Sequence, residues 1–295
     1  MNDERRNLAG IGLMLAAMAV MPFLDVVAKM LALQDMPVLE IVWARMAIGL
    51  LMTAPFAARA AGPRGLWPSQ PGLHVLRAGF LIGATFCFFW SLKFLPIADA
   101  LAIFFVQPLV VTALSPLVLG EHVGRRRWTA VAIGFLGTLV IIRPGFQEIN
   151  PGMPLALVSG TSLALFMLIT RRMAGQDHPM VITFHTSLIG AAAVSLVLWP
   201  FWQAPTAGQW LLFVALGFIA TAGHYLIVMA YDRAEASLLA PLAYTEMIMS
   251  VVVGWWFFGD FPDIWTFAGV GVLIGCAIYI SVREHRVRQT GPSQP

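Results

Sequence analysis

Ten long apolar runs, separated by short polar connections, dominate this sequence. They cover residues 8–31, 38–58, 76–95, 98–119, 126–142, 153–172, 180–200, 210–230, 237–258 and 265–282. A helix needs about 20 apolar residues to cross the hydrocarbon core of a bilayer. Only 11% of the 295 residues are charged, against about 25% in soluble domains. We therefore predict an all-α polytopic membrane protein with ten transmembrane helices.

The basic residues predict the orientation of these spans. With the N-terminus inside, most of the 18 Lys and Arg residues fall on the inner side, including Arg77 at the start of the third span. Lys29, Lys93 and Arg143 fall on the outer side, and Arg45 lies within the second span. Because positive loops stay in the cytoplasm, we expect both termini there and the protein in the cell inner membrane. The basic balance then reflects topology, and nucleic acid is not an expected partner.

An internal duplication divides the chain into halves of five spans, over residues 8–148 and 152–283. Its anchors are Lys29–Pro37 with Arg171–Pro179, Leu119–Glu121 with Phe258–Asp260, and Trp128 and Gly134 with Trp265 and Gly271. Five is an odd number, so the second half begins on the opposite side of the membrane. Inverted repeats of this kind are a recurring plan of secondary transporters, whose substrate sites lie near the midplane.

Several motifs carry a resemblance to a known family. Leu119-Gly-Glu-His-Val-Gly-Arg-Arg-Arg-Trp128 and Phe258-Gly-Asp-Phe-Pro-Asp-Ile-Trp265 end the two halves. With the five-plus-five plan, residues 8–282 resemble the EamA-type branch of the drug/metabolite transporter superfamily. Asp25–Lys29, Glu40–Arg45 and Ala240–Glu246 resemble the bacterial branch that includes S-adenosylmethionine and riboflavin importers. The resemblance implies transport of small organic solutes without ATP hydrolysis.

Glu246 and Gln107 are the first candidate site residues. Glu246 lies near the middle of the ninth span, and the repeat offset gives Gln107 as its counterpart in the fourth. We expect the two to face each other across a pseudo-twofold axis. An ionisable group in a span usually faces a cavity or a partner, so Glu246 is predicted to bind substrate or couple protons. The alternative is a structural hydrogen bond between helices.

Asp25, Lys29 and Arg45 form the second candidate group. Asp25 and Lys29 are spaced i, i+4 on the first span, so they share a face and can pair. Either they line the mouth of an outer cavity or Lys29 anchors the helix end. Arg45 cannot share a face with Glu40, so it needs a partner from another helix, and Asp25 is our candidate. A structural clamp and a contact to a substrate anion are both open for Arg45.

The remaining candidates are His224, Tyr244 and Trp90. His224 is expected either to shuttle protons or to hydrogen-bond between helices. The rings of Tyr244 and Trp90 are predicted either to line a cavity and stack on a flat solute or to pack. Glycines of the third and tenth spans are expected at close helix contacts of the small-xxx-small type, and they leave a homodimer open. These glycines are Gly79, Gly83, Gly269, Gly271 and Gly275.

The sequence has the features of a transporter and lacks those of an enzyme. It contains no Walker A loop, no His-Glu-x-x-His and no Gly-x-Ser-x-Gly, and we predict no catalytic residue, cofactor or metal. The expected partners are a small-molecule substrate and membrane lipid. We predict alternating-access transport of a metabolite such as riboflavin, S-adenosylmethionine or an amino acid, with uptake favoured. The alternatives are an exporter of amino acids or drugs, and a facilitator channel without coupling.

Overall fold

The secondary structure of the chain is helical throughout the part that the structure describes. The computed structural model describes residues 2–120, 124–143, 150–173, 176–231, 233–234 and 239–290. Its elements are α1 Asn2–Leu33, α2 Val38–Gly65, α3 Pro71–Ser91, α4 Ile97–Phe104, α5 Gln107–Leu119, α6 Arg125–Ile142, α7 Gly152–Arg172, α8 Pro179–Leu198, η1 Trp199–Phe201, α9 Ala207–Tyr231, η2 Ala240–Tyr244, α11 Thr245–Phe258 and α12 Ile264–Thr290. The predicted all-α class is confirmed.

Most of these helices match the predicted spans in length. Within the described ranges, seven segments are long and apolar enough to cross a membrane, with Ile97–Leu119 counted as one segment. Three further apolar helices are shorter, and they are Trp128–Ile142, Leu242–Phe258 and Ile264–Cys276. They correspond to the fifth, ninth and tenth predicted spans. The chain is therefore a multi-pass membrane protein, while the count of ten crossings stays a prediction.

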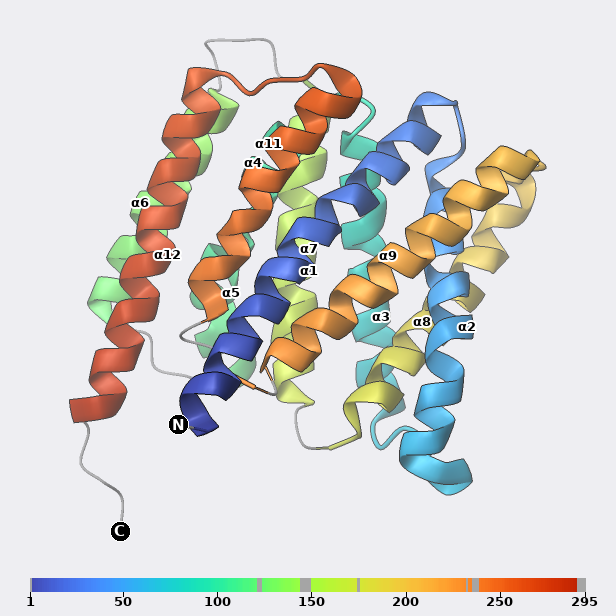
Figure 1. The fold of residues 1–295 in the computed structure, drawn as a ribbon, viewed down its shortest axis with the longest axis horizontal. Coiled ribbons are helices and arrows are strands. Elements are labelled where there is room, and N and C mark those ends of the chain that lie inside the picture. Colours follow the sequence, from blue (N-terminus) through green and yellow to red (C-terminus); the bar gives the residue numbers. More distant parts are fainter. Residues whose placement is uncertain are drawn as a thin grey trace.

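The helices form one bundle (Figure 1). The start of α1 and the end of α12 lie at the same end, which is the lower end in Figure 1. The α1–α2 and α11–α12 connections lie at the opposite, upper end. The segment before α7 also lies at the upper end, because Asn150 donates a hydrogen bond to the carbonyl of Phe94, just beyond α3. Helix α7 therefore runs in the opposite direction to α1.

The most extensive helix contacts all join the first half of the chain to the second. They are α3 with α7, α1 with α9, α2 with α8, and α6 with α12. If each helix is replaced by its counterpart in the other half, the α3–α7 pair becomes the α1–α9 pair, whereas the α2–α8 and α6–α12 pairs stay the same. The two halves therefore interdigitate, and neither packs as a separate body.

The repeat anchors Gly120 and Gly259 have the same conformation. Each directly follows a helix, α5 and α11 respectively, and each is in the left-handed region, with φ of 70° and 71°. Glycine adopts this conformation without the steric cost that a Cβ atom imposes. The sequence match therefore corresponds to a shared way of ending a helix.

Two helices are interrupted near the middle of the bundle. The predicted span 98–119 is not one continuous helix, because α4 ends at Phe104 and α5 begins at Gln107. Pro108 lacks an N–H and its ring would collide with the carbonyl of Phe104 in a regular helix. In the second half, Pro241 lies in the short 3₁₀ turn η2, which precedes α11. Both interruptions are flanked by other helices, as lipid requires of irregular backbone.

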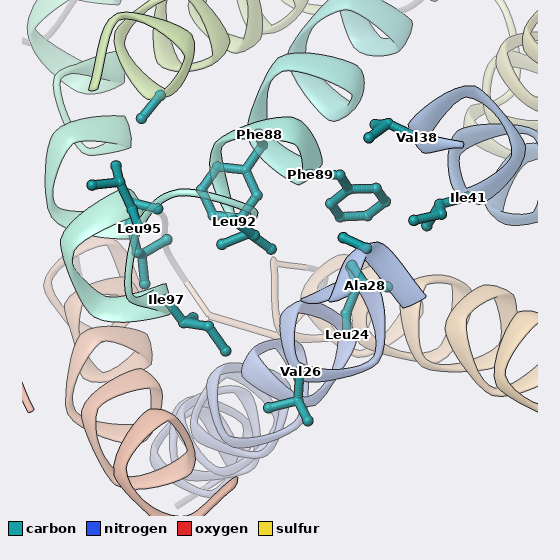
Figure 2. Close-up of a cluster of buried hydrophobic side chains, with 14 of the residues drawn as sticks. Leu24, Val26, Ala28, Val38, Ile41, Phe88, Phe89, Leu92, Leu95 and Ile97 are labelled. Atoms are coloured by element: carbon teal, nitrogen blue, oxygen red, sulfur yellow. The ribbon is translucent and has the colours of Figure 1, made fainter. Parts of the chain in front are cut away.

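The hydrophobic core is dense at the upper end of the bundle. Figure 2 shows Phe89 of α3 beside Ile41 of α2 and Ala28 of α1, with Phe88 in the same cluster. Phe89 retains 2% of its accessible surface, and Ile41 and Ala28 are fully buried. This cluster holds the ends of α1, α2 and α3 together.

The predicted close helix contact is confirmed at Gly269 and is not found within the bundle at Gly79, Gly271 or Gly275. A Cβ atom on Gly269 would lie 2.3 Å from Ile141, so this glycine permits the close approach of α12 and α6. Nothing lies within 4 Å of a Cβ atom built on Gly79, Gly271 or Gly275, and the nearest atom to one on Gly83 is at 3.9 Å. Spacing alone could not distinguish a contact face from an open face.

We expect Gly160→Ala to destabilise the protein. Gly160 of α7 faces the α4–α5 interruption, and its Cβ would lie 2.5 Å from the carbonyl oxygen of Phe104. Backbone cannot move aside cheaply, so the cost should be about 1–3 kcal/mol, seen as a lower melting temperature of the purified protein. Gly79→Ala is the control, because its Cβ meets open space. Equal melting temperatures for the two variants would contradict this packing.

Candidate functional site

Three charged side chains from three helices converge in the middle of the bundle. Asp25 lies on α1, Arg45 on α2, and Glu246 in the first turn of α11. The Asp25 carboxyl is attracted by the Arg45 guanidinium and repelled by the Glu246 carboxyl. The interaction between Asp25 and Arg45 agrees with the sequence prediction. The two form no ion pair within 4 Å in the described chain, so they are electrostatic neighbours and not a closed clamp.

These charged groups have unused hydrogen-bonding capacity. The carboxylates of Asp25 and Glu246 accept no hydrogen bond from the described residues, yet none of their oxygens is fully buried. Arg45 donates from Nη1 to Thr85 Oγ1 of α3, which leaves Nε and Nη2 open. Buried polar groups are normally satisfied. Accessible, unpaired charges inside a membrane bundle are therefore suited to binding a ligand.

The formal charge of this trio is negative. Two carboxylates face one guanidinium, and charges within a span are costly unless a partner or water compensates them. A cationic group or a proton held between Asp25 and Glu246 would relieve their mutual repulsion. The arrangement can therefore bind an ammonium, a sulfonium or a proton.

An aromatic contact joins the two interrupted helices beside the trio. The rings of Phe105 and Tyr244 lie 5.2 Å apart, centre to centre. Phe105 precedes Gln107 by two residues, and Tyr244 precedes Glu246 by two residues, so the contact links equivalent positions of the two halves. Tyr244 is partly exposed, and no hydrogen bond of its hydroxyl is described. Whether Tyr244 lines a cavity or only packs against Phe105 therefore stays a prediction.

Gln107 lies at the start of α5, as Glu246 lies at the start of α11. Its side-chain nitrogen contacts the sulfur of Met167 on α7. No described contact joins Gln107 directly to Glu246, so the expectation that they face each other stays a prediction.

Lys29 does not pair with Asp25, which corrects the prediction from i, i+4 spacing. Its Nζ donates to Asp260 Oδ2 at 2.7 Å and to the carbonyl of Leu95 at 3.0 Å. It also lies 4.8 Å from the ring centre of Phe258. The α11–α12 connection covers this end of α1, and that neighbour is more than 200 residues away in the sequence. Lys29 therefore links α1 to the α11–α12 connection at the upper end of the bundle.

A second polar group reinforces the upper end. Asp99, at the start of α4, accepts a hydrogen bond from Thr266 Oγ1 at 2.9 Å. Arg143, at the end of α6, forms an ion pair with Asp263 in the α11–α12 connection. These contacts join the ends of both halves.

Trp90 lies away from the charged trio. It borders a hollow of about 530 Å³ at the upper end of the bundle. Phe86, Lys93 and Trp202 also line this hollow. Trp90 packs on Phe86 with 5.4 Å between ring centres. The hollow has aromatic walls, but the structure does not bring Trp90 to Glu246.

His224 of α9 is exposed and lies within electrostatic range of Arg45 and of a second arginine, Arg77. Its Nδ1 bonds the carbonyl of Ala220 at 2.8 Å, within its own helix. A carbonyl only accepts, so Nδ1 carries the hydrogen and Nε2 is free to accept. The hydrogen bond of Nδ1 therefore stays within α9 and is not the bond between helices that was expected as the alternative.

Arg77 is the residue that the sequence analysis misplaced. We placed it at the start of the third span, on the inner side, but it lies in the second turn of α3, because this helix begins at Pro71 and not at residue 76. The side chain is 7% exposed. Pro71, a residue type favoured in the first turn of a helix, was the available signal for an earlier helix start.

A polar tie closes the lower end of the bundle. Asp177, between α7 and α8, accepts a hydrogen bond from His74 Nε2 at 3.0 Å and bonds from the Ser69 backbone and hydroxyl. Burial raises the pKa of the Asp177 carboxyl, but the hydrogen bonds from Ser69 and His74 outweigh it, and the pKa lies below its usual value. This tie joins the α2–α3 connection to the α7–α8 connection.

Comparison with known proteins identifies similar sequences along the whole chain. The model of the EamA-like transporter family matches twice, over residues 8–143 and 150–282. The S-adenosylmethionine uptake transporter of Rickettsia prowazekii is 24% identical over 287 residues, which cover 97% of each chain. The riboflavin transporter of Vibrio cholerae is 26% identical over 288 residues, 96% of each chain.

Two further similarities concern direction and fold. The pseudopaline exporter of Pseudomonas aeruginosa is 27% identical over 269 residues, which cover 89% of this chain and 93% of the exporter. A solved crystal structure that covers 96% of this chain and 99% of its own matches with a TM-score of 0.65 at 20% sequence identity. At this identity the match supports the fold alone.

We expect Asp177→Asn to lower stability at neutral pH by about 1.5–3 kcal/mol, the usual scale for a hydrogen bond to a charged group. The folded-state pKa is depressed, so the carboxylate stabilises the protein fully above its unfolded-state pKa of about 3.9. This contribution is lost as the pH falls through the lower folded-state value. Melting temperatures of wild type and variant should differ at pH 7 and converge in acid.

The matched control is Asp35→Asn. Asp35 is the repeat counterpart of Asp177, is exposed and adopts a left-handed φ of 58° that asparagine tolerates well. Its substitution should leave the melting temperature unchanged. A difference between wild type and Asp177→Asn that persists well below pH 3.9 would mean that the charge of Asp177 is not responsible.

Proposed function

The chain belongs to the EamA-like transporter family, and we propose that it is a secondary transporter that moves a small organic metabolite across the bacterial inner membrane by alternating access. The family membership confirms the resemblance to the drug/metabolite transporter superfamily that the sequence motifs indicated. Its bacterial relatives include an S-adenosylmethionine uptake transporter and a riboflavin transporter. We favour uptake on this ground.

The observation that carries this proposal is the set of open charges at the middle of the bundle. Asp25 and Arg45 come from the first half and Glu246 from the second, and both carboxylates lack a hydrogen-bond partner among the described residues although none of their oxygens is fully buried. A site built from both halves changes its exposure when the halves move relative to each other. Side chains that served only to hold the helices together would be expected to bond each other.

Alternating access is supported by the equivalence of the two halves. Their largest mutual contacts exchange with one another when the halves are swapped, and α1 and α7 run in opposite directions. Such a plan allows two arrangements of similar energy, with the site open to either side. The ring contact of Phe105 with Tyr244 lies where the axis relating the halves would pass.

The charges and rings of the site restrict the cargo. The negative excess of Asp25 and Glu246 over Arg45 favours a cationic group, which S-adenosylmethionine and amino acids both carry. The rings of Phe105 and Tyr244 could stack on the flat base of S-adenosylmethionine or on riboflavin. We therefore propose cargo that combines a cationic group with an apolar or aromatic part.

Export is the second candidate function. The pseudopaline exporter of Pseudomonas aeruginosa is about as similar to this chain as the uptake transporters are. Alternating access is reversible, so the direction follows the gradients of cargo and of any coupled ion. Uptake and efflux assays in cells expressing the protein would distinguish the two directions.

We expect Glu246→Gln to reduce transport at least about tenfold, since a change of 1.4 kcal/mol in binding corresponds to that factor. The purified protein is reconstituted into liposomes, and the liposomes are loaded with S-adenosylmethionine, riboflavin or an amino acid. Saturable counterflow is then measured between pH 5.5 and 8. Glu40→Gln is the control, because Glu40 lies about 140° around α2 from Arg45 and accepts a hydrogen bond from the backbone N–H of Gln203. Unchanged counterflow and pH profile in Glu246→Gln would refute the assigned role.

A charge swap tests the electrostatic partnership of Asp25 and Arg45. Asp25→Arg or Arg45→Asp alone should abolish counterflow, because each places like charges together in the membrane. The double variant keeps the net charge of the site, so we expect it to recover part of the lost activity, measured at equal reconstituted protein. Activity of the double variant no higher than that of the worse single variant would mean that the two residues act independently.

A further inference from the structure

Arg77 is a buried cation whose described partners are all neutral. From α3 it donates to Thr170 Oγ1 of α7 at 2.7 Å, and to Thr186 Oγ1 and the carbonyl of Ile182 on α8, the latter at 3.3 Å. Its guanidinium carbon lies 4.2 Å from the ring centre of Phe166. No carboxylate of the described chain lies within ion-pair distance.

One edge of this guanidinium remains free. The described bonds engage Nε and Nη1, and Nη2 takes part in none of them. Nη2 also retains some accessible surface, although the residue as a whole is only 7% exposed. The two threonines and Phe166 therefore fix the orientation of the side chain and leave two N–H donors on Nη2 available.

A guanidinium without a counterion is unusual inside a membrane bundle. Ionisable groups there are costly and normally pair with one another or line a polar pathway. Arg45 has Asp25 as its electrostatic neighbour, and Lys29 has Asp260. Arg77 has no equivalent among the described residues, so its preferred counterion is one that arrives with the ligand.

Arg77 lies on α3, and Arg45 lies against the same helix. Arg45 bonds Thr85, about two turns beyond Arg77 on this helix, and the imidazole of His224 lies within electrostatic range of both guanidiniums. Carboxylates therefore come from α1 and α11, and guanidiniums from α2 and α3. With Arg77 included, the formal charges of the four groups balance. A ligand that carries both signs, with its charges separated, complements such a site.

We infer that Arg77, with Arg45, binds a carboxylate of the substrate, while Asp25 and Glu246 receive its cationic group, so that the cargo is a zwitterion of the amino-acid type. This inference rests on the proposed carrier function and narrows it. A carboxylate fits the planar guanidinium of arginine better than the ammonium group of lysine, because two parallel N–H donors of the guanidinium meet the two carboxylate oxygens. Cargo without a carboxylate, such as riboflavin, leaves the Arg77 charge uncompensated.

The test compares ligands that differ in the carboxylate. Binding to purified protein is measured by calorimetry for S-adenosylmethionine and its decarboxylated form, and for methionine and methioninamide. We expect wild type to bind at least one carboxylate ligand at least about tenfold more tightly than its partner. Arg77→Gln should abolish that ratio, and Arg77→Lys should preserve part of it. Because the ratio is taken within one variant, loss of overall stability does not mimic the result.

Arg59→Gln is the matched control. It removes the same charge from an exposed position on α2, and it should leave the ratio unchanged. The inference is overturned if no carboxylate ligand of the panel binds, if wild type binds both members of each pair equally, or if Arg77→Gln weakens both members of a pair to the same extent.

Counterflow in liposomes separates this inference from the carrier function. Arg77-dependent binding of a carboxylate without any counterflow by wild type would reject the carrier and retain the carboxylate site. Saturable counterflow of riboflavin or of decarboxylated S-adenosylmethionine, unaffected by Arg77→Gln, would retain the carrier and reject the carboxylate site.

Discussion

In a bilayer the backbone must satisfy its own hydrogen bonds, and this constraint decides where the present chain can depart from a helix. The α4–α5 interruption exposes the carbonyl of Phe104, and α7 covers it closely because residue 160 is glycine. The second interruption, at η2, lies against α1 and α12. Irregular backbone is thus confined to places shielded by other helices. Gln107 and Glu246 lie at the helix starts that follow these two interruptions.

The sequence predicted the central charges well, because an ionisable group inside an apolar run is costly and therefore conspicuous. Asp25, Arg45 and Glu246 were found in this way, and the structure brings them within electrostatic range of one another. The partner of Lys29 could not be predicted, because it depends on how a distant connection folds over α1. Arg77 was misplaced for another reason: hydropathy marks where apolar residues begin, whereas the helix begins at Pro71, more than one turn earlier.

The halves share a backbone plan and differ in the charges attached to it. Gly120 and Gly259 end equivalent helices in the same conformation, whereas Gln107 is neutral where Glu246 is ionisable. Asp177 is held by Ser69 and His74, and its counterpart Asp35 is exposed. In the alternating access that we propose, the common backbone allows two related arrangements, and the differences in side chains determine which of them is preferred and what the centre can bind.

Both ends of the bundle are held by polar ties in this conformation. Lys29 with Asp260 fastens the upper end, and Asp177 with His74 fastens the lower end. A carrier must release one tie to open that end, at a cost of about 1–3 kcal/mol for a charged hydrogen bond. A ligand can shift such an equilibrium only by binding one state more tightly than the other. A zwitterion that compensates Arg77 and relieves Asp25 and Glu246 at once has that differential affinity, provided the four groups close around it in only one of the two states.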